Sequence, residues 1–444
     1  MTVFARLKDH LFSRRSEYAQ RKPVVKPESD PEDEGDATLR AGIEHSRRTF
    51  QYFYHSQLHQ FCSPADKPGT VNTIHGYLVW PVAIALWMTA DCAKRTRSHL
   101  DKHQLELAYN AMERHWNPEE NGYCAWIMFN GNRDIYYDDN AHCANALITA
   151  YEATEDKKYL RRAAGIATRL IPRGWHRDQD PGGVEWHVDQ PNSRHACSTL
   201  SVAVMACRLA LHGVEKNHCM ELAKSCIDFS LEHLVDQNDG LVIDAIKRDV
   251  DHGESTWKPD VVKWTYNTGF AIEALLLWSQ LSGSTAYLEI AKKMALAAIN
   301  KNLALYDQNT PDYENRQWWD STFFAQHLAE ALVLLARALP STELSHNITA
   351  EVGRFVTYCQ TYLMDPQDRM FYRNLRMYVI DESRLATFNE VFNGSIKRLK
   401  PDAAERANGE GSIEDRPLIK TMLANSAMAR ILLCISDLRE ETRR

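Results

Sequence analysis

A pair of apolar helical stripes, separated by a short polar turn, recurs along most of this 444-residue chain. Within each stripe the apolar residues stand three or four positions apart, as on the buried face of an α-helix. Each pair therefore predicts a helical hairpin, and the hairpins return every 55 to 70 residues or so, roughly the scale of a helical array. Four pairs are clear, at 144–171, 200–227, 271–294 and 328–359, and two more hairpins are predicted at Gly42–Arg95 and Met370–Asp437.

Longer loops rich in Gly, Trp and Asp lie between the hairpins, at the same phase of each repeat. Long loops inside a compact domain usually carry function. Loops in phase collect on one face, so we expect an all-α fold in which a closed toroid of hairpins, an α/α barrel, bears its active-site loops at one mouth. An open α-solenoid is the alternative, but a solenoid would use shorter loops. The loops include 121–123, 180–183, 239–240 and 257–260, and segment 69–72 is the predicted loop within the hairpin Gly42–Arg95.

The first residues differ from the rest. Residues 1–37 contain a Pro-rich, acidic stretch that cannot bury a core, which predicts a flexible charged tail. Residues 38–444 are predicted to form a single domain. Hydrophobic residues make up 44% of the chain, enough for a large core.

Two adjacent carboxylates, Asp138 and Asp139, follow an aromatic pair and open one of the predicted helices. Asp is a preferred helix N-cap, so helix capping is one explanation of this pair. Capping needs only one of the two, however. Two like charges close together push their pKa values apart, so one carboxyl can act as an acid while the other is ionised. Retaining glycosidases use such a pair about 5 to 5.5 Å apart.

Seven tryptophans lie mostly outside the apolar stripes, where they either plug the toroid or form stacking platforms for sugar rings. Several histidines lie near predicted loops, among them His142 and His195, and paired His bases offer a rival isomerase chemistry. The tryptophans are Trp126, Trp175, Trp186, Trp257, Trp264, Trp318 and Trp319.

Other classes of function find less support. The net charge of −7 argues against nucleic acid and membrane partners, which attract basic patches. No metal-ligand spacing is visible, so no metal and no cofactor are expected. The ten scattered cysteines favour buried free thiols over a disulfide framework. The N-terminus has no apolar signal region and no run could span a bilayer, so the expected location is cytoplasmic.

Four segments, in this order, resemble glycoside hydrolase family 76, the α-1,6-mannanase family that includes fungal wall proteins. The likeness runs from about residue 40 to the C-terminus, and the chain looks like an atypical fungal-type member without a signal peptide. Two segments of the sequence depart from the family pattern, at His142–Cys143 and at 194–198. The matching segments are 136–152, 182–186, 239–244 and 264–269.

The resemblance implies a six-hairpin (α/α)6 barrel and a retaining glycosidase or transglycosidase acting on α-mannoside-like saccharides. By the family pattern Asp138 would be the nucleophile and Asp139 the acid/base. The partner would be a saccharide or other small-molecule substrate. The residues predicted to contact the substrate are Tyr137, Asn140, His142, Trp186, His195, Trp264, Tyr266 and Asn267.

Two rivals remain open at this point. One is an isomerase, epimerase or cyclase that reuses the barrel mouth, with His142 or His195 as its base. The other is a non-catalytic sugar-binding protein, in which Asp138 is only a helix cap.

Overall fold

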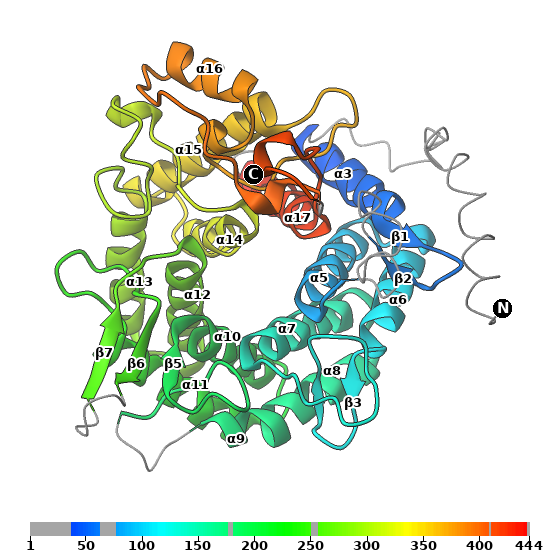
Figure 1. Cartoon of the computed structure of the whole chain (residues 1–444). Coiled ribbons are helices and arrows are strands. Elements are labelled where there is room, and N and C mark those ends of the chain that lie inside the picture. Colours follow the sequence, from blue (N-terminus) through cyan, green and yellow to red (C-terminus); the bar gives the residue numbers. More distant parts are fainter. Residues whose placement is uncertain (1–36, 63–76, 176–180, 250–255, 408–409, 442–444) are drawn as a thin grey trace. The chain divides into compact units, whose positions relative to one another are not determined.

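Helices that lie next to one another around a ring dominate the fold (Figure 1). The computed structural model describes residues 37–62, 77–175, 181–249, 256–407 and 410–441. Within these residues six helices form the inner ring, each packing against the next, and the last packs against the first. They are α5 (Val79–Thr96), α7 (Tyr137–Thr154), α10 (Ala196–Leu211), α12 (Thr265–Ser282), α14 (Thr322–Ala338) and α17 (Met422–Glu441).

Each inner helix has a partner on the outside of the ring. The contrast between the two sets follows from their sequences: α10 buries nearly every side chain, whereas the outer α8 buries only three of its residues. A helix apolar on all sides must be surrounded, and one with a single apolar stripe covers a surface. The outer helices are α3 (Ala37–Phe53), α6 (His99–Glu113), α8 (Lys157–Gly165), α11 (Lys216–His233), α13 (Thr285–Ala298) and α15 (Glu343–Tyr358).

This arrangement confirms the predicted all-α (α/α)6 barrel. It differs from the prediction in how the ring closes. The N-terminal outer helix α3 packs mainly on the C-terminal inner helix α17, rather than forming an isolated hairpin with α5. A β-carbon on Gly42 of α3 would lie 3.0 Å from the backbone nitrogen of Leu433 in α17, so the two helices touch closely there.

The hairpin predicted at Met370–Asp437 is replaced by irregular structure with the short helix α16 (Glu382–Val391) before α17. The predicted tail, apart from Ala37, and the loop at 69–72 lie outside the described residues. From Ala37 onward the chain forms one compact unit.

Short strands and single β-bridges join outer helices to inner ones. The longest sheet has three antiparallel strands, in which His195 pairs with Ala245 and Ala245 with Asp260. It lies where α10 begins. The strands are β1 (Tyr54–His55), β2 (Gln60–Phe61), β3 (Trp116–Asn117), β4 (Gly122–Tyr123), β5 (Ser193–His195), β6 (Ala245–Asp249) and β7 (Thr256–Asp260).

The starts of the inner helices are tied to one another around the mouth. The first backbone N–H groups of a helix have no partner within the helix. In five inner helices the N–H of the first residue donates instead to the loop of the next hairpin, so each loop stabilises its neighbour. The bonds run from Val79 to Ala125, Tyr137 to Trp186, Ala196 to Asp244, Thr265 to the Asp320 carboxylate, and Thr322 to Arg373, at 2.8 to 2.9 Å.

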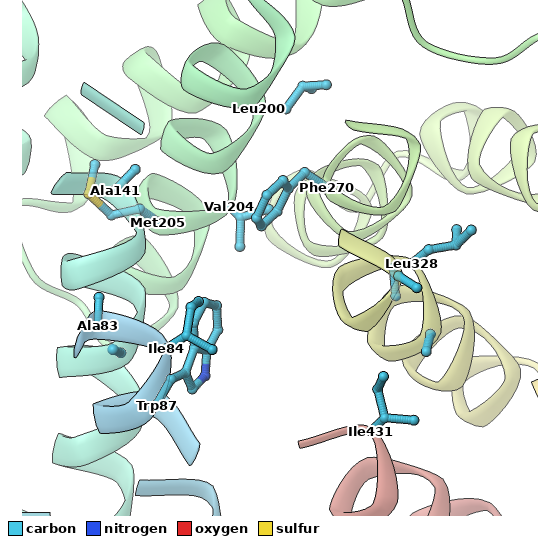
Figure 2. Close-up of a cluster of buried hydrophobic side chains, with 14 of the residues drawn as sticks. Ala83, Ile84, Trp87, Ala141, Leu200, Val204, Met205, Phe270, Leu328 and Ile431 are labelled. Carbon is cyan, nitrogen blue, oxygen red and sulfur yellow. The ribbon is translucent and has the colours of Figure 1, made fainter. Parts of the chain in front are cut away.

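Buried apolar side chains from all six inner helices belong to one core cluster (Figure 2). Trp87 of α5 contacts His327 of α14 and lies under the guanidinium of Arg430 from α17. Arg430 is 2% exposed and pairs with Asp91 and with Glu330. The ring is therefore closed beneath the mouth, which leaves the mouth as its accessible end.

The contact between α12 and α14 gives a stability prediction. A β-carbon on Gly269 would lie 2.5 Å from Leu328 N and 2.6 Å from His327 C, both backbone atoms that cannot swing aside. We expect Gly269→Ala to destabilise the fold by about 2 to 3 kcal/mol, the scale of overpacking. Gly353→Ala on α15 is the matched control, because nothing lies within 4 Å of its new methyl group. Thermal unfolding midpoints of the two variants test this, and equal midpoints would contradict the close helix contact.

Candidate active site

Asp138 and Asp139 lie in the first turn of α7, half-buried at the mouth of the barrel. The N-cap position belongs to Tyr136, and no side chain caps the helix there. Helix capping therefore does not explain why two carboxylates stand at this point. The first turn does favour negative charge, because the helix dipole is positive there.

Three donors converge on the Asp138 carboxylate. The indole Nε1 of Trp186 donates to Oδ2 at 3.1 Å, the Cys197 Sγ lies 3.3 Å from the same oxygen, and the Asp139 backbone N–H donates to Oδ1 at 2.9 Å. Burial raises the pKa of Asp138 above its usual value, and these hydrogen bonds oppose that rise. Hydrogen bonds to the charged form keep a carboxyl ionised. Of the two carboxyls, Asp138 is the one whose hydrogen bonds favour the charged form.

Asp139 has the opposite environment. Burial raises its pKa well above the usual value, and the negative charges of Asp138 and Asp134 raise it further. No donor group opposes these effects among those that shift its pKa. Of the two carboxyls, Asp139 is therefore the one whose environment more strongly favours the protonated form.

The loop that carries Trp186 is bound to the start of α7 by the backbone. Tyr137 N donates to Trp186 O at 2.9 Å, and Val188 N donates to Ile135 O at 3.2 Å. The buried Arg194 guanidinium holds the other arm of the loop through Gly182 O at 2.9 Å. The backbone bonds to the start of α7 and the bond from Arg194 thus hold the loop so that the Trp186 indole stays beside Asp138.

A third carboxylate, Asp244, faces the pair from the loop before β6. Its Oδ1 accepts a hydrogen bond from Asn267 Nδ2 at 3.2 Å, and its Oδ2 lies 3.9 Å from His195 Nδ1. Burial raises the pKa of Asp244 to about 6, and the charge of Asp138 contributes to the shift. Segment 239–244 is one of the four family-like segments of the sequence, but no role was predicted for Asp244 itself. Asp244 comes one residue before Ala245, which pairs with His195, so the sheet brings it to the start of α10.

Half-buried aromatic rings wall the other side of the mouth. Tyr266 stacks on Phe324 with ring centres 4.3 Å apart, and Trp264 lies 4.7 Å from Trp319. Trp80 lies 6.0 Å from Phe324 and continues this wall. Trp264, Tyr266 and Trp319 were singled out from the sequence, whereas the other two rings were missed because they sit within apolar helical stripes.

Three residues predicted to contact substrate lie elsewhere. Tyr137 is 2% exposed and packs on Gly174, where a β-carbon would come 2.4 Å from its ring. Asn140 is fully buried and clamps the backbone of Tyr123, accepting from its N–H at 2.7 Å and donating to its carbonyl at 2.9 Å. Both side chains support the site from behind, which differs from the substrate contact predicted for them.

His142, the third, is 3% exposed and lies among Phe270, His327 and Trp80, within the packed interior. Burial lowers the pKa of His142 to about 3, so the ring is neutral. His195, by contrast, reaches the mouth, with its ring 5.3 Å from Trp186. Burial lowers its pKa to about 4.

Of the remaining tryptophans, Trp318 is 1% exposed, donates to Ala298 O of α13 and packs on Phe355 of α15, so it belongs to the core beside these outer helices. Among the described residues, no three His, Cys, Asp or Glu side chains are grouped as a metal site. In the same part of the chain, no helix is both long and apolar enough to cross a bilayer. Several cysteines are buried free thiols, as predicted: Cys92, Cys143, Cys197, Cys207, Cys219 and Cys359.

Comparison with known proteins places the chain among carbohydrate-active barrels. It belongs to glycosyl hydrolase family 76, whose sequence model matches residues 42–361, and this confirms the resemblance. The Meiotically up-regulated gene 191 protein of Schizosaccharomyces pombe is 33% identical over 407 residues, covering 88% of this chain and 90% of that protein.

Solved structures share the fold at lower identity. The GH76A α-1,6-mannanase from Salegentibacter sp. HEL1_6 has a TM-score of 0.67 at 19% identity, covering 90% of this chain and 99% of the other. An inactive variant of that enzyme, with two aspartates changed to asparagine, was solved with α-1,6-mannotriose. Dfg5 from Chaetomium thermophilum, in complex with glucosamine, has a TM-score of 0.63 at 13% identity and covers 93% of each chain.

Proposed function

We propose that this protein is a retaining glycosidase or transglycosidase that acts on α-mannosides, with Asp138 as nucleophile and Asp139 as acid/base. The observation that carries the proposal is the opposite environment of two adjacent carboxyls. Asp138 receives three donors, while the pKa of Asp139 is raised by burial and by neighbouring negative charge. A retaining glycosidase needs this division between an ionised and a protonated carboxyl.

In the first step an Asp138 oxygen attacks the anomeric carbon of the bound sugar. The bond from that carbon to the leaving oxygen breaks, its electron pair stays on the leaving oxygen, and Asp139 supplies the proton. A covalent glycosyl-enzyme on Asp138 and an ionised Asp139 result.

In the second step the Asp139 carboxylate takes a proton from a water molecule or from a sugar hydroxyl. The oxygen so activated attacks the anomeric carbon, and Asp138 leaves as a carboxylate. Water gives hydrolysis and a sugar hydroxyl gives transfer. Both outcomes use the same two residues.

The proposed substrate class rests on the relatives and on the walls of the mouth. The Salegentibacter relative is an α-1,6-mannanase, and its variant binds α-1,6-mannotriose. In this chain the half-buried rings of Tyr266 and Trp264 both pack on Phe324, and such aromatic surfaces suit the apolar C–H faces of a sugar. Tyr266 lies close enough to Asp138 for that charge to raise its pKa.

His195 and Asp244 offer polar groups for the hydroxyls of the sugar on the other side of the mouth. Asn267, which was also predicted to contact the substrate, is fully buried and supports Asp244 by donating to its Oδ1.

The rival chemistry with a histidine base has less support. His142 lies in the packed interior, away from the accessible mouth. The cap-only reading of Asp138 is also disfavoured, because Tyr136 occupies the cap position.

The pKa shifts predict a bell-shaped dependence of kcat/KM on pH. Activity falls as the pH drops through the pKa of Asp138, because a protonated carboxyl cannot attack. It falls again as the pH rises through the raised pKa of Asp139, because an ionised carboxyl cannot protonate the leaving oxygen. The two apparent values belong to the interacting pair. In Asp139→Asn, assayed on a substrate with an activated leaving group, the alkaline limb should disappear; its persistence would contradict the assignment.

The test of the proposed function is the stereochemistry of the reaction. Proton NMR follows the anomeric signal of the first product formed from an α-1,6-linked mannooligosaccharide. The proposal expects α-mannose or an α-linked transfer product before mutarotation. A β-anomer as the first product would exclude the Asp138 nucleophile.

A further inference from the structure

Cys197 is the one donor to Asp138 whose role the proposed function leaves unexplained. It lies in the first turn of α10 and is 3% exposed. Its Sγ is 3.3 Å from Asp138 Oδ2, the same oxygen that accepts from Trp186 Nε1. Tyr266 of α12 lies close enough to the sulfur for each side chain to affect the pKa of the other.

The chemistry of the thiol fixes the direction of this hydrogen bond. Burial raises the pKa of the Cys197 thiol well above its usual value, and the charges of Asp138 and Asp244 raise it further. The sulfur therefore keeps its proton, and an ionised carboxylate can only accept. The S–H of Cys197 donates to Asp138 Oδ2.

A thiol is a weak donor compared with a hydroxyl or an amide N–H. A donor lowers the pKa of a carboxylate, and lowers it less when the hydrogen bond is weak. A carboxylate held by a weak donor stays more basic and is a better nucleophile. A carboxylate accepts roughly four hydrogen bonds, and the three donors here leave one acceptor position, on Oδ1.

We propose that Cys197 is a positioning residue that fixes Oδ2 of the Asp138 nucleophile through a weak S–H donor, which holds the carboxylate in place without quenching its reactivity. The inference rests on the proposed function of Asp138. It adds a residue outside the Asp pair, in segment 194–198, where this sequence departs from the family pattern.

Other titratable groups also act on Asp138, and none of them is substituted when Cys197 is changed. Asp139 and Tyr136 face it from the start of α7, Asp244 from the loop before β6, and Tyr266 from α12. A change in the pKa of Asp138 on substitution of Cys197 can therefore be assigned to the loss of the thiol.

The first arm of the test compares Cys197→Ala with Cys197→Ser. Both remove the bulk of the sulfur, but serine returns a stronger donor. The acid limb of kcat/KM should move to higher pH in Cys197→Ala and to lower pH in Cys197→Ser, each by about 0.5 to 1 pH unit. Cys207→Ala, a change to another buried thiol ten residues along α10, should leave the limb unmoved. Equal shifts in the Ala and Ser variants, or none, would overturn the proposal.

The second arm needs no turnover. The S–H stretching band of Cys197 is obtained as the infrared difference between the unsubstituted protein and Cys197→Ala. We expect this band at lower wavenumber than the band of Cys207, obtained the same way, and we expect Asp138→Asn to shift it upward. A Cys197 band that Asp138→Asn leaves unchanged would overturn the proposal.

The two arms separate the inference from the proposed function. If the protein turns over no α-mannoside, the proposed function fails and the infrared band still decides whether Cys197 donates to Asp138. If turnover depends on Asp138 but the acid limb of kcat/KM is the same in both Cys197 variants as in the unsubstituted protein, only the proposed role of Cys197 is wrong.

Discussion

Asp138→Asn should lower kcat on an α-1,6-linked mannooligosaccharide by roughly 10⁴-fold or more, the scale of losing a covalent nucleophile. The neutral amide keeps the size of the side chain and cannot attack the anomeric carbon. Because burial disfavours the charge of Asp138 in the folded protein, its removal should leave the thermal unfolding midpoint within a few degrees. Steady-state kinetics and a thermal scan on the same preparation measure both.

A matched control separates catalysis from helix capping. Asp156 is a true N-cap, since its side chain accepts from Lys158 N at 2.9 Å at the start of α8. Asp156→Asn makes the same chemical change at a helix start, and Asn caps about as well as Asp. We expect normal turnover and stability from it. If Asp138→Asn also retains turnover, Asp138 is not the nucleophile.

Asp139→Asn should produce a loss that depends on the leaving group. On an unactivated mannoside, whose leaving oxygen needs a proton, we expect kcat to fall by about 10²- to 10⁴-fold. On an aryl mannoside with a good leaving group the first step should proceed, and the glycosyl-enzyme should accumulate because the second step lacks its base. A burst of released phenol followed by slow turnover is the expected time course.

An added anion gives the check on this variant. Azide can attack the glycosyl-enzyme without a general base and should restore turnover of the aryl mannoside, with release of a mannosyl azide of retained configuration. An equal loss on both substrates, with no rescue by azide, would show that Asp139 is not the acid/base.

The ring of helices was predictable because the spacing of apolar residues within each helix is a local feature of the sequence. Apolar residues at helical spacing report the buried face of each helix, and the loops fall at a constant phase between them. The start of α7 was likewise found at the Asp pair. The closure of α3 on α17 was not predictable, because periodicity says which face is buried and not which distant helix covers it.

The part of the site that was predicted from the sequence lies within the family-like motifs. Asp138 and Trp186 are separated by 48 residues, yet a family-like order of motifs brought both into the prediction. His142 was predicted to contact the substrate but is buried in the ring, and helix geometry alone could have shown this. It stands four residues after Asp138 on the same helix face, one turn deeper into the ring. Cys197 and Asp244 needed the structure, since only the contacts between neighbouring loops bring them to the pair.

Trapping the glycosyl-enzyme tests most directly whether Asp138 is the nucleophile. Asp139→Asn is incubated with an activated mannoside, quenched with acid, digested, and the peptides are sequenced by mass spectrometry. We expect a mass increase of one mannosyl group on the peptide that contains Asp138, located at that residue. A label on another residue, or an active enzyme from which no covalent adduct can be trapped and whose product is inverted, would contradict the assignment of Asp138 as the nucleophile.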